Sequence, residues 1–352
     1  MDQLIQKMVE LAAGHEPFTL ATVIVRNGSA PRSAGAKMLV GQNGEITGTV
    51  GGGILEAQVR DLAALTFKGR NATIQSFQFN GKDAASMDAI CGGQVEVLIE
   101  WVNPGNPETA AVIQGLEHAV ALHQKAWLIT IFRGGSAASA HALVQGDGTI
   151  IGALPAGISI ETVLEKRMPD RIELDQALVM VEPVNISGTA VIFGAGHVSR
   201  SLAEYTRAVG FWTMVVDDRP EYASRERFPW ADQIVVLDSF TNLTGKLQVD
   251  RDRYIVIVTR GHLNDQAVLE QMLKTRAGYI GMIGSRRKCE LIFQNLRSNG
   301  VPEEEIRRVH APIGISIHAE TPEEIGVSIV AEMIRERAVL QQQDLPVFGK
   351  SS

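Results

Sequence analysis

The first half of the chain carries a mixture of helical and strand-like hydrophobic patterns. Apolar residues recur at helical spacing from Met1 to Ala13, and this spacing predicts an opening helix. Short runs rich in β-branched residues predict strands, expected at residues 18–25, 37–40, 46–50, 73–79, 94–101, 127–132, 141–145, 149–152 and 176–184. Further helices are expected at residues 51–67, 104–124 and 160–165. The pattern therefore predicts a mixed α+β domain over residues 1–184.

The pattern changes after Val184, where strand-like and helical stretches begin to alternate. The strands are expected at residues 190–193, 212–216, 233–237, 254–259 and 279–283, and the helices at 198–209, 265–274, 288–298 and 322–343. This alternation predicts βαβ units and an α/β fold with a Rossmann-like, doubly wound parallel sheet. We expect a linker at residues 185–188, where turn formers gather, a Rossmann-like domain at 189–345 and a flexible tail at 346–352.

Composition and charge exclude several classes of protein. The 352 residues carry a net charge of −7, which repels a phosphate backbone, so no nucleic-acid partner is expected. No uncharged apolar run approaches the roughly 18 residues that cross a bilayer, so no membrane association is expected. The two cysteines, Cys91 and Cys289, are too few for a disulfide scaffold or an iron–sulfur cluster. They fit a reducing cytosol, and we expect a cytoplasmic protein.

A glycine loop in the second half is typical of dinucleotide binding. Gly194 and Gly196 follow a predicted strand, and Ser199 replaces the third glycine of the usual pattern with another small residue. Asp217 ends the next predicted strand about 20 residues later, where an acid binds the ribose of a dinucleotide. Such an acid favours NAD over NADP. The alternative is a Rossmann fold that binds nothing, or a ligand other than NAD.

Other residues after the predicted strands are candidates for the same crevice. His197 lies inside the glycine loop, where it would either crowd a pyrophosphate or face solvent. His262 follows the fourth strand. Gly284, Ser285 and Arg286 follow the fifth strand, where Ser285 can cap the next helix while Arg286 faces an oxyanion. The alternative for this basic segment is an ordinary solvated helix start.

The first half holds three further glycine-containing elements. Gly28, Ser29, Arg32 and Lys37 form a loop that could wrap an anion with backbone N–H groups and neutralise it, or simply connect two strands at the surface. The consecutive residues Gly51, Gly52 and Gly53, followed by Glu56, indicate a close approach of backbone to a bulky group. Gly92 and Gly93 follow Cys91 and favour an accessible thiol, which we interpret as a candidate catalytic or metal-contacting group.

These motifs resemble the XdhC/CoxI family in both halves and in the expected order. The residues that carry the resemblance are the segments 28–38, 48–56 and 91–93 in the first half, and 193–198, 259–265, 283–288 and 321–325 in the second. The XdhC branch is the better match, because Ile54 stands where the CoxI branch often has cysteine. Ser316 stands where the family usually has aspartate, which puts a carboxylate role there in doubt.

The resemblance implies an accessory protein for molybdenum hydroxylases such as xanthine dehydrogenase. Family members bind molybdenum cofactor (molybdopterin), help with its terminal sulfuration and deliver it to the apo-enzyme, and they usually form homodimers. A cysteine desulfurase is a further partner that this role suggests. We expect a cofactor chaperone rather than a catalyst, because the chain is too short and too poor in cysteine to be xanthine dehydrogenase itself. The alternatives are an NAD-dependent oxidoreductase and a nucleotide-sensing regulator.

Overall fold

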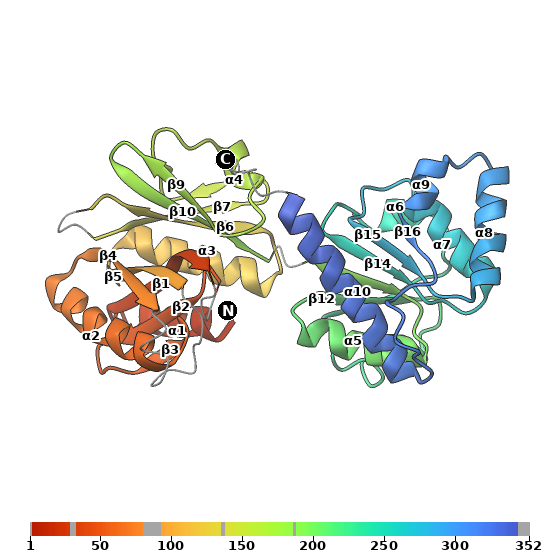
Figure 1. The fold of residues 1–352 in the computed structure, drawn as a ribbon, viewed down its shortest axis with the longest axis horizontal. Coiled ribbons are helices and arrows are strands. Elements are labelled where there is room, and N and C mark those ends of the chain that lie inside the picture. Colours follow the sequence, from red (N-terminus) through yellow and green to blue (C-terminus); the bar gives the residue numbers. More distant parts are fainter. Residues whose placement is uncertain (1, 29–32, 80–92, 135–137, 186–187, 344–352) are drawn as a thin grey trace. The chain divides into compact units, whose positions relative to one another are not determined.

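The computed structural model describes residues 2–28, 33–79, 93–134, 138–185 and 188–343 (Figure 1). The chain divides into two compact units, Met1–Asn185 and Ile186–Ser352, which are described separately.

The N-terminal unit contains two antiparallel five-stranded sheets. The first has the order β3-β2-β1-β5-β4 and the second has the order β8-β7-β6-β10-β9. The strands are β1 (Phe18–Gly28), β2 (Lys37–Gly41), β3 (Ile46–Gly48), β4 (Ala72–Phe79), β5 (Gly93–Val102), β6 (Ala126–Phe132), β7 (Ala140–Gln145), β8 (Ile150–Ile151), β9 (Asp170–Leu174) and β10 (Ala177–Val184). The helices are α1 (Asp2–Ala13), α2 (Gly53–Gly69), α3 (Pro107–Ala121) and α4 (Ile160–Leu164).

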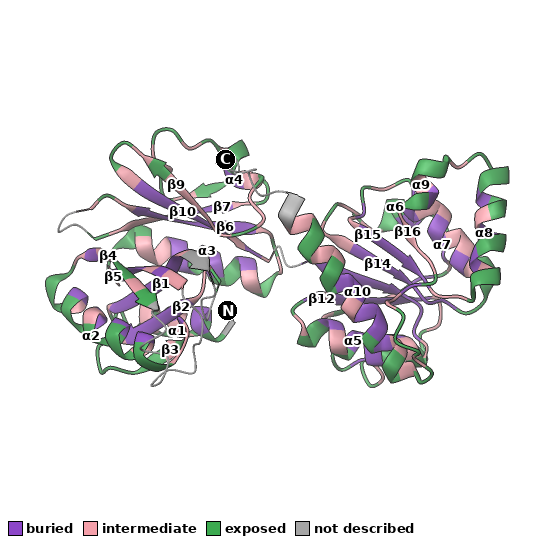
Figure 2. Cartoon of the chain, viewed as in Figure 1, coloured by how far each residue is buried: buried purple, intermediate pink, exposed green. Residues whose placement is uncertain are grey.

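Both faces of the first sheet carry buried side chains, which explains why residues 18–25 of its central strand are apolar except for the buried Thr19 and Thr22 (Figure 2). Ala21 and Val23 of β1 pack with the buried side of α2 on one face. On the other face Leu20 packs with Met8 of α1 and with residues of α3. Helices α1 and α3 also pack with Leu128 of the second sheet, so they join the two sheets into one unit.

The C-terminal unit is built on a six-stranded parallel sheet with the order β13-β12-β11-β14-β15-β16. Its strands are β11 (Thr189–Phe193), β12 (Trp212–Asp217), β13 (Gln233–Val236), β14 (Arg253–Ile257), β15 (Tyr279–Met282) and β16 (Val309–His310). Its helices are α5 (His197–Ala208), α6 (Leu243–Lys246), α7 (His262–Met272), α8 (Arg286–Ser298), α9 (Glu303–Arg307) and α10 (Pro322–Gln343). This strand order is the doubly wound Rossmann order.

Two apolar cores lie on opposite faces of the parallel sheet. One contains Leu202 of α5 and Met333 of α10, and the other contains Leu269 of α7 and Ile292 of α8. Because both faces are covered by helices, the strands read as continuous apolar runs. The predicted fold class, a mixed N-terminal domain followed by a Rossmann-like domain, is confirmed.

The hydrophobic pattern did not predict β9, α6, α9 or β16. These elements have two to five residues each, and β9 alternates charged Arg171 and Glu173 with apolar positions. An edge strand with charged side chains carries little hydrophobic signal. In the described part of the chain, no helix is long and apolar enough to cross a membrane.

Candidate functional site

The predicted site residues of the C-terminal unit lie together at the carboxyl edge of the parallel sheet. The glycine loop follows β11, Asp217 ends β12, and His262 begins α7 shortly after β14. The segment 284–286 connects β15 to α8. These positions flank the boundary between β11 and β14, where the strand order reverses. Open α/β sheets bind ligands in the crevice at this point.

The loop contains glycine at positions 194 and 196 for different structural reasons. Gly194 has a φ of 114°, and a Cβ there would lie 2.4 Å from the carbonyl oxygen of Val258. Close packing against the neighbouring strand therefore requires glycine at this position. At Gly196, apart from its chain neighbours Ala195 and His197, no atom lies within 4 Å of the position of a Cβ, and φ is −79°. The missing side chain at Gly196 leaves open space before the N-terminus of α5, which a ligand could fill.

This difference gives a prediction for a matched pair of variants. Gly194→Ala is expected to lower the free energy of unfolding by about 2 kcal/mol or more, because it combines an unfavourable φ with a backbone clash. Gly196→Ala is expected to leave the melting temperature unchanged or slightly raised, because alanine accepts its φ. Calorimetry of the two variants beside the wild type checks this. Equal melting temperatures for the two variants would contradict the assignment.

Two further loop residues differ in exposure. His197 begins α5 and its side chain is exposed. Ser199 is completely buried, and its hydroxyl oxygen has no hydrogen-bond partner among the described residues. Ser199 thus packs in the interior at the first turn of α5. Because its side chain is buried, the structure does not support the expected contact of this side chain with a ligand.

Asp217 has the predicted position but not the predicted role. Its carboxylate is 1% exposed and accepts the Ala195 amide at 2.7 Å, the Arg219 amide at 3.0 Å and two guanidinium N–H groups of Arg219 at 2.9 and 3.0 Å. Burial raises the pKa of Asp217, but the bonds from Arg219 and Ala195 outweigh it and leave the pKa below its ordinary value. All of the acceptor capacity is therefore used, so a ribose hydroxyl would have to displace one of these donors.

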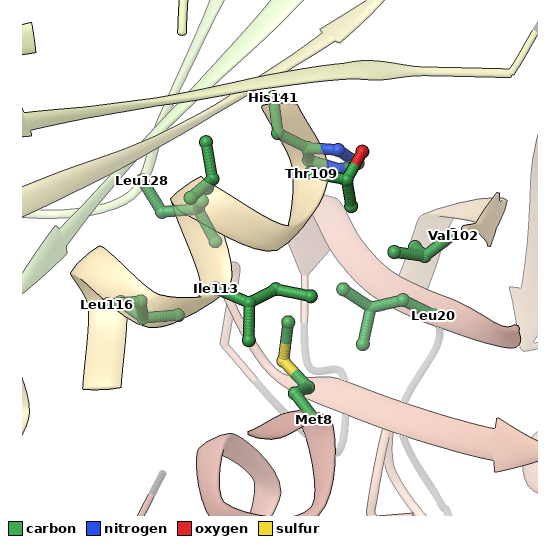
Figure 3. Close-up of a pocket in the computed structure, with 9 residues that line it drawn as sticks. Met8, Leu20, Val102, Thr109, Ile113, Leu116, Leu128 and His141 are labelled. Carbon is green, nitrogen blue, oxygen red and sulfur yellow. The ribbon is translucent and has the colours of Figure 1, made fainter. Parts of the chain in front are cut away.

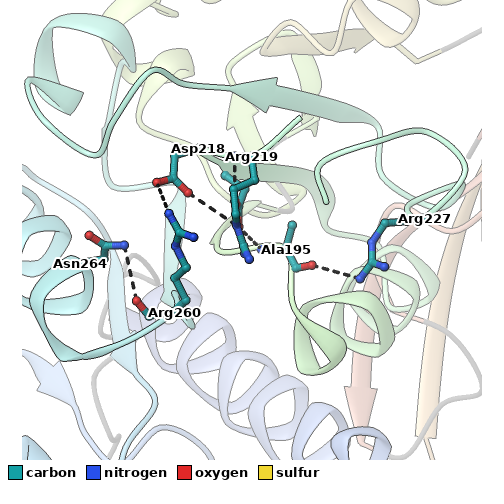
Figure 4. A network of polar contacts seen from close by, with 7 residues as sticks. Ala195, Asp218, Arg219, Arg227, Arg260 and Asn264 are labelled. Atoms are coloured by element: carbon teal, nitrogen blue, oxygen red, sulfur yellow. Dashed lines mark hydrogen bonds and ion pairs between the residues drawn. The ribbon is translucent and has the colours of Figure 1, made fainter. Parts of the chain in front are cut away.

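A group of arginines that the sequence pattern did not predict lies at the same edge (Figure 4). Arg219 lies over the ring of Tyr222, 3.9 Å from its centroid, and Arg227 lies 4.9 Å from the same centroid. Arg227 also donates to the carbonyl of Ala195 in the glycine loop. Arg260, in the segment that follows β14, pairs with Asp218. The run Asp217-Asp218-Arg219 was the available signal, because it places a cation two residues after the strand end.

A buried carboxylate organises the other side of the crevice. Asp265 is completely buried and accepts the hydroxyl of Thr259 at 2.6 Å and the ammonium of Lys288 at 2.5 Å. Ser285 accepts the amide of Lys288 and caps α8, as predicted for a helix start. The predicted ligands His262, Ser285 and Arg286 are exposed around this network, and Gly284 packs on the stem of Lys288. Their contact with a ligand stays a prediction.

In the N-terminal unit, the topology brings the described ends of two predicted motifs together. Gly28, the last residue of β1, pairs directly with Gly93, the first residue of β5. Lys37 begins β2 opposite Thr22, in the middle of β1, and Gly48 ends β3 opposite Met38. The predicted residues Ser29, Arg32, Cys91 and Gly92 lie outside the described residues. Gly28 and Gly93 are therefore neighbours, whereas Lys37 lies farther along the sheet, and the contacts of Cys91 stay a prediction.

The three consecutive glycines are held by their own neighbours. Glu56 accepts the hydroxyl of Thr49 and the amide of Gly52, the latter at 3.0 Å, and Thr49 accepts the amide of Gly51 at 3.1 Å. Gly51, Gly52 and Gly53 all have positive φ. In this conformation the amides of Gly51 and Gly52 and one oxygen of Glu56 are used locally, which explains why the chain requires glycine before α2. A cofactor contact of these residues stays a prediction.

Lys37 has a buried partner that the sequence analysis did not find. Its ammonium lies 2.7 Å from Glu182 of β10 and 2.8 Å from the hydroxyl of Thr22, and both charged side chains are 5% exposed. The expectation that Lys37 neutralises a bound anion is therefore not supported by the structure, because its charge is already paired inside the unit.

A second polar pair lies in the interior of the same unit. His141 of β7 lies 3.2 Å from the carboxylate of Glu100 in β5, and Glu100 is completely buried. Burial raises the pKa of Glu100, but His141 outweighs it and holds the pKa below its ordinary value. The cavity beside His141 is lined by apolar side chains such as Met8, Leu20 and Ile113, together with Thr109 (Figure 3). This lining does not fit a phosphorylated ligand.

The described residues provide no ready metal centre. Within the described ranges, no three histidine, cysteine, aspartate or glutamate side chains come together to hold a metal ion. Cys289 is 2% exposed in α8, and burial raises its thiol pKa, so it is an inert core residue. A role of Cys91, the other cysteine of the chain, as a thiolate ligand for a metal stays a prediction.

The strand order and the glycine loop at the carboxyl edge of the sheet define the second unit as a Rossmann-type domain. Comparison with known proteins matches parts of both units to models of one family. The model of the XdhC Rossmann domain matches residues 190–333, and the model of the XdhC and CoxI family matches residues 11–78. The chain belongs to the XdhC and CoxI family.

Individual relatives agree with this placement. A crystal structure described as a xanthine dehydrogenase from Bacillus halodurans is 25% identical, with a TM-score of 0.76 over 97% of this chain and 98% of that one. The molybdenum cofactor insertion chaperone PaoD of Escherichia coli is 21% identical over 96% of this chain and 88% of its own length. The Escherichia coli protein YqeB is 28% identical over 91% of this chain, but this chain spans only 43% of its length.

Proposed function

We propose that this protein binds molybdenum cofactor, supports its sulfuration and inserts it into a molybdenum hydroxylase of the xanthine dehydrogenase type. The observation that carries the proposal is the similarity, over 96% of the chain, to a protein named as a molybdenum cofactor insertion chaperone. We further propose that the protein acts as a cytoplasmic homodimer, and that a cysteine desulfurase is a second partner.

The carboxyl edge of the Rossmann-type unit fits the phosphorylated end of such a cofactor. The open space at Gly196 admits a ligand next to the N-terminus of α5. Arg227 has a buried Nε with no hydrogen-bond partner among the described residues. Backbone N–H groups and guanidinium groups are the donors that phosphate prefers in proteins. The cofactor supplies the metal and its terminal ligands when bound, and this chain supplies the donors that hold it.

Cofactor retention tests the proposal. The protein, produced in a host that makes molybdenum cofactor, is expected to retain both pterin and molybdenum through gel filtration. Pterin is quantified by the fluorescence of its oxidised form, and molybdenum by elemental analysis. The loaded protein is then expected to activate an apo-hydroxylase. Retention no greater than that of an unrelated Rossmann-fold protein would refute cofactor binding.

The second candidate function is an NAD-dependent oxidoreductase, which the Rossmann strand order favours. This candidate predicts thermal stabilisation by NAD, because a ligand that binds only the folded state raises the melting temperature. The complete pairing of Asp217 weighs against it. No shift with either millimolar NAD or millimolar NADP would count heavily against this candidate.

We expect Cys91→Ala to reduce sulfuration of the partner hydroxylase much more than it reduces stability. A thiol followed directly by two glycines, Gly92 and Gly93, is suited to bind soft sulfur or metal atoms. The measurement compares the sulfido content and activity of the partner after incubation with each protein. Cys289→Ala is the control, because Cys289 is a buried core residue. Unchanged partner activity with Cys91→Ala would remove Cys91 from the site.

A further inference from the structure

Arg227 carries a charge that the surrounding chain does not balance. Its guanidinium donates to the carbonyl of Ala195 at 3.4 Å. Its Nε is buried and has no hydrogen-bond partner, and no carboxylate in the described part of the chain pairs with it. A buried unsatisfied donor on a cation is unfavourable, and such a group needs a water, an ion or a ligand to complete it.

A second cation lies beside it. Arg219 and Arg227 both contact the ring of Tyr222, so two positive charges lie near one ring. Asp217 pairs with Arg219 through its Nε and one terminal nitrogen. Asp218 lies 3.7 Å from the same Nε and also pairs with Arg260. Three guanidinium groups thus face two carboxylates, which leaves an excess positive charge at Arg227 and unused N–H donors next to the glycine loop (Figure 4).

We propose that Arg227 and Arg219 form a subsite for a phosphomonoester dianion at the carboxyl edge of the Rossmann-type unit. A dianion would satisfy the Nε of Arg227 and balance the second guanidinium. The open space at Gly196 lies one residue from Ala195, so the ligand has room to approach. Arg260 forms an outer part of the same edge through Asp218 and is 58% exposed.

The subsite selects a ligand by phosphate and not by ribose. Asp217 is 1% exposed and fully engaged, so it cannot recognise a ribose diol without losing Arg219 or Ala195. A 2′-phosphorylated nucleotide should therefore bind better than its unphosphorylated form, which is the reverse of the preference that Asp217 indicates in the sequence. The phosphate of the pterin cofactor has the same chemistry, and this second source rests on the proposed function.

Binding assays with the full chain separate the two sources. Calorimetry and thermal shift compare the affinity for adenosine 2′,5′-bisphosphate with that for 5′-AMP, and the affinity for NADP with that for NAD. A separate measurement quantifies the pterin that the protein retains from a cofactor-producing host. Arg227→Gln is expected to weaken binding of the phosphate-bearing probe, or retention of pterin, by about ten- to a hundred-fold. Arg227→Lys keeps the charge but loses the planar donor set, so its binding should be intermediate.

Arg225→Gln is the matched control. Arg225 is an exposed arginine in the same segment, and it donates to the carbonyl of Ala231. The Arg225→Gln protein should bind every probe with the affinity of the wild type. The melting temperatures of the free variants verify folding, and Arg227→Lys keeps the test decisive if Arg227→Gln does not fold.

The outcomes are distinguishable. If phosphate probes bind in an Arg227-dependent way but the wild type retains no pterin, the subsite stands and the proposed cofactor function fails. If the wild type retains pterin and Arg227→Gln and Arg227→Lys retain as much, the subsite is wrong and the proposed function stands. Equal affinities of wild type and both Arg227 variants for all probes would also overturn the subsite.

Discussion

Replacement of Glu182 by glutamine is expected to lower the free energy of unfolding of the N-terminal unit by about 3–5 kcal/mol. Glu182 is the carboxylate partner of Lys37, and both side chains are 5% exposed. In the Glu182→Gln variant, the ammonium of Lys37 keeps the hydroxyl of Thr22 and gains the neutral amide oxygen of the new glutamine in place of the carboxylate. The buried ammonium of Lys37 has lost most of its hydration, and without Glu182 most of the compensation for that loss is gone. We therefore expect this substitution to be strongly destabilising.

A double variant tests the reason for the effect. Lys37→Met combined with Glu182→Leu removes both charges, so it should recover most of the lost stability. Lys7→Gln serves as the surface control, since the pair between Lys7 and Glu10 is exposed and its removal should hardly move the melting temperature. Calorimetry and hydrogen exchange of peptides from β1, β2 and β10 give the measurement. A Glu182→Gln protein as stable as the Lys7→Gln protein would show that the buried pair contributes little.

The same pair shows a limit of sequence analysis. A lysine near glycines and hydroxyls favours an anion site when only neighbouring residues are considered. The actual partner is 145 positions away along the chain and belongs to the other sheet. No local pattern predicts which acid faces Lys37 across two packed sheets, because that depends on the registers of β2 and β10.

At the Rossmann-type edge the sequence predicted position better than role. The alternation of apolar runs located the parallel strands, and glycine spacing located the loop, because both depend on local backbone geometry. Spacing also put Asp217 at the end of β12. Its commitment to Arg219 and Ala195 depends on side-chain conformations that spacing does not determine. Arg227 lies in an irregular segment, where hydrophobic periodicity gives no signal.

The acid sensitivity of the C-terminal unit is expected to depend strongly on Glu332. This residue of α10 is 6% exposed and accepts the hydroxyl of Tyr279 and the amide of Gly314, both at 2.8 Å. It also contacts His310 and Arg335. Burial raises the pKa of Glu332, but these partners outweigh it and lower the pKa to about 2. Glu332 therefore joins α10 to β15, β16 and the loop at Gly314.

The sign of the pH dependence follows from this lowered pKa. The unfolded chain has the ordinary carboxyl pKa of 4.5, so protons bind the unfolded state first as the pH falls. The contribution of Glu332 to stability is fully present above about pH 5 and is lost between pH 5 and pH 2. A depression of this size corresponds to about 3 kcal/mol at neutral pH.

Glu332→Gln should therefore be less stable than the wild type at pH 7 by up to about 3 kcal/mol, and the difference should shrink steadily towards pH 3. Hydrogen exchange of peptides from β15, β16 and α10, measured at several pH values, isolates this unit within the full chain. Glu336→Gln is the control on the same helix, because Glu336 pairs with the half-exposed Arg335 and its removal should give a small difference. A constant difference between Glu332→Gln and wild type from pH 7 to pH 3 would mean that packing, and not the buried carboxylate charge, makes Glu332 important.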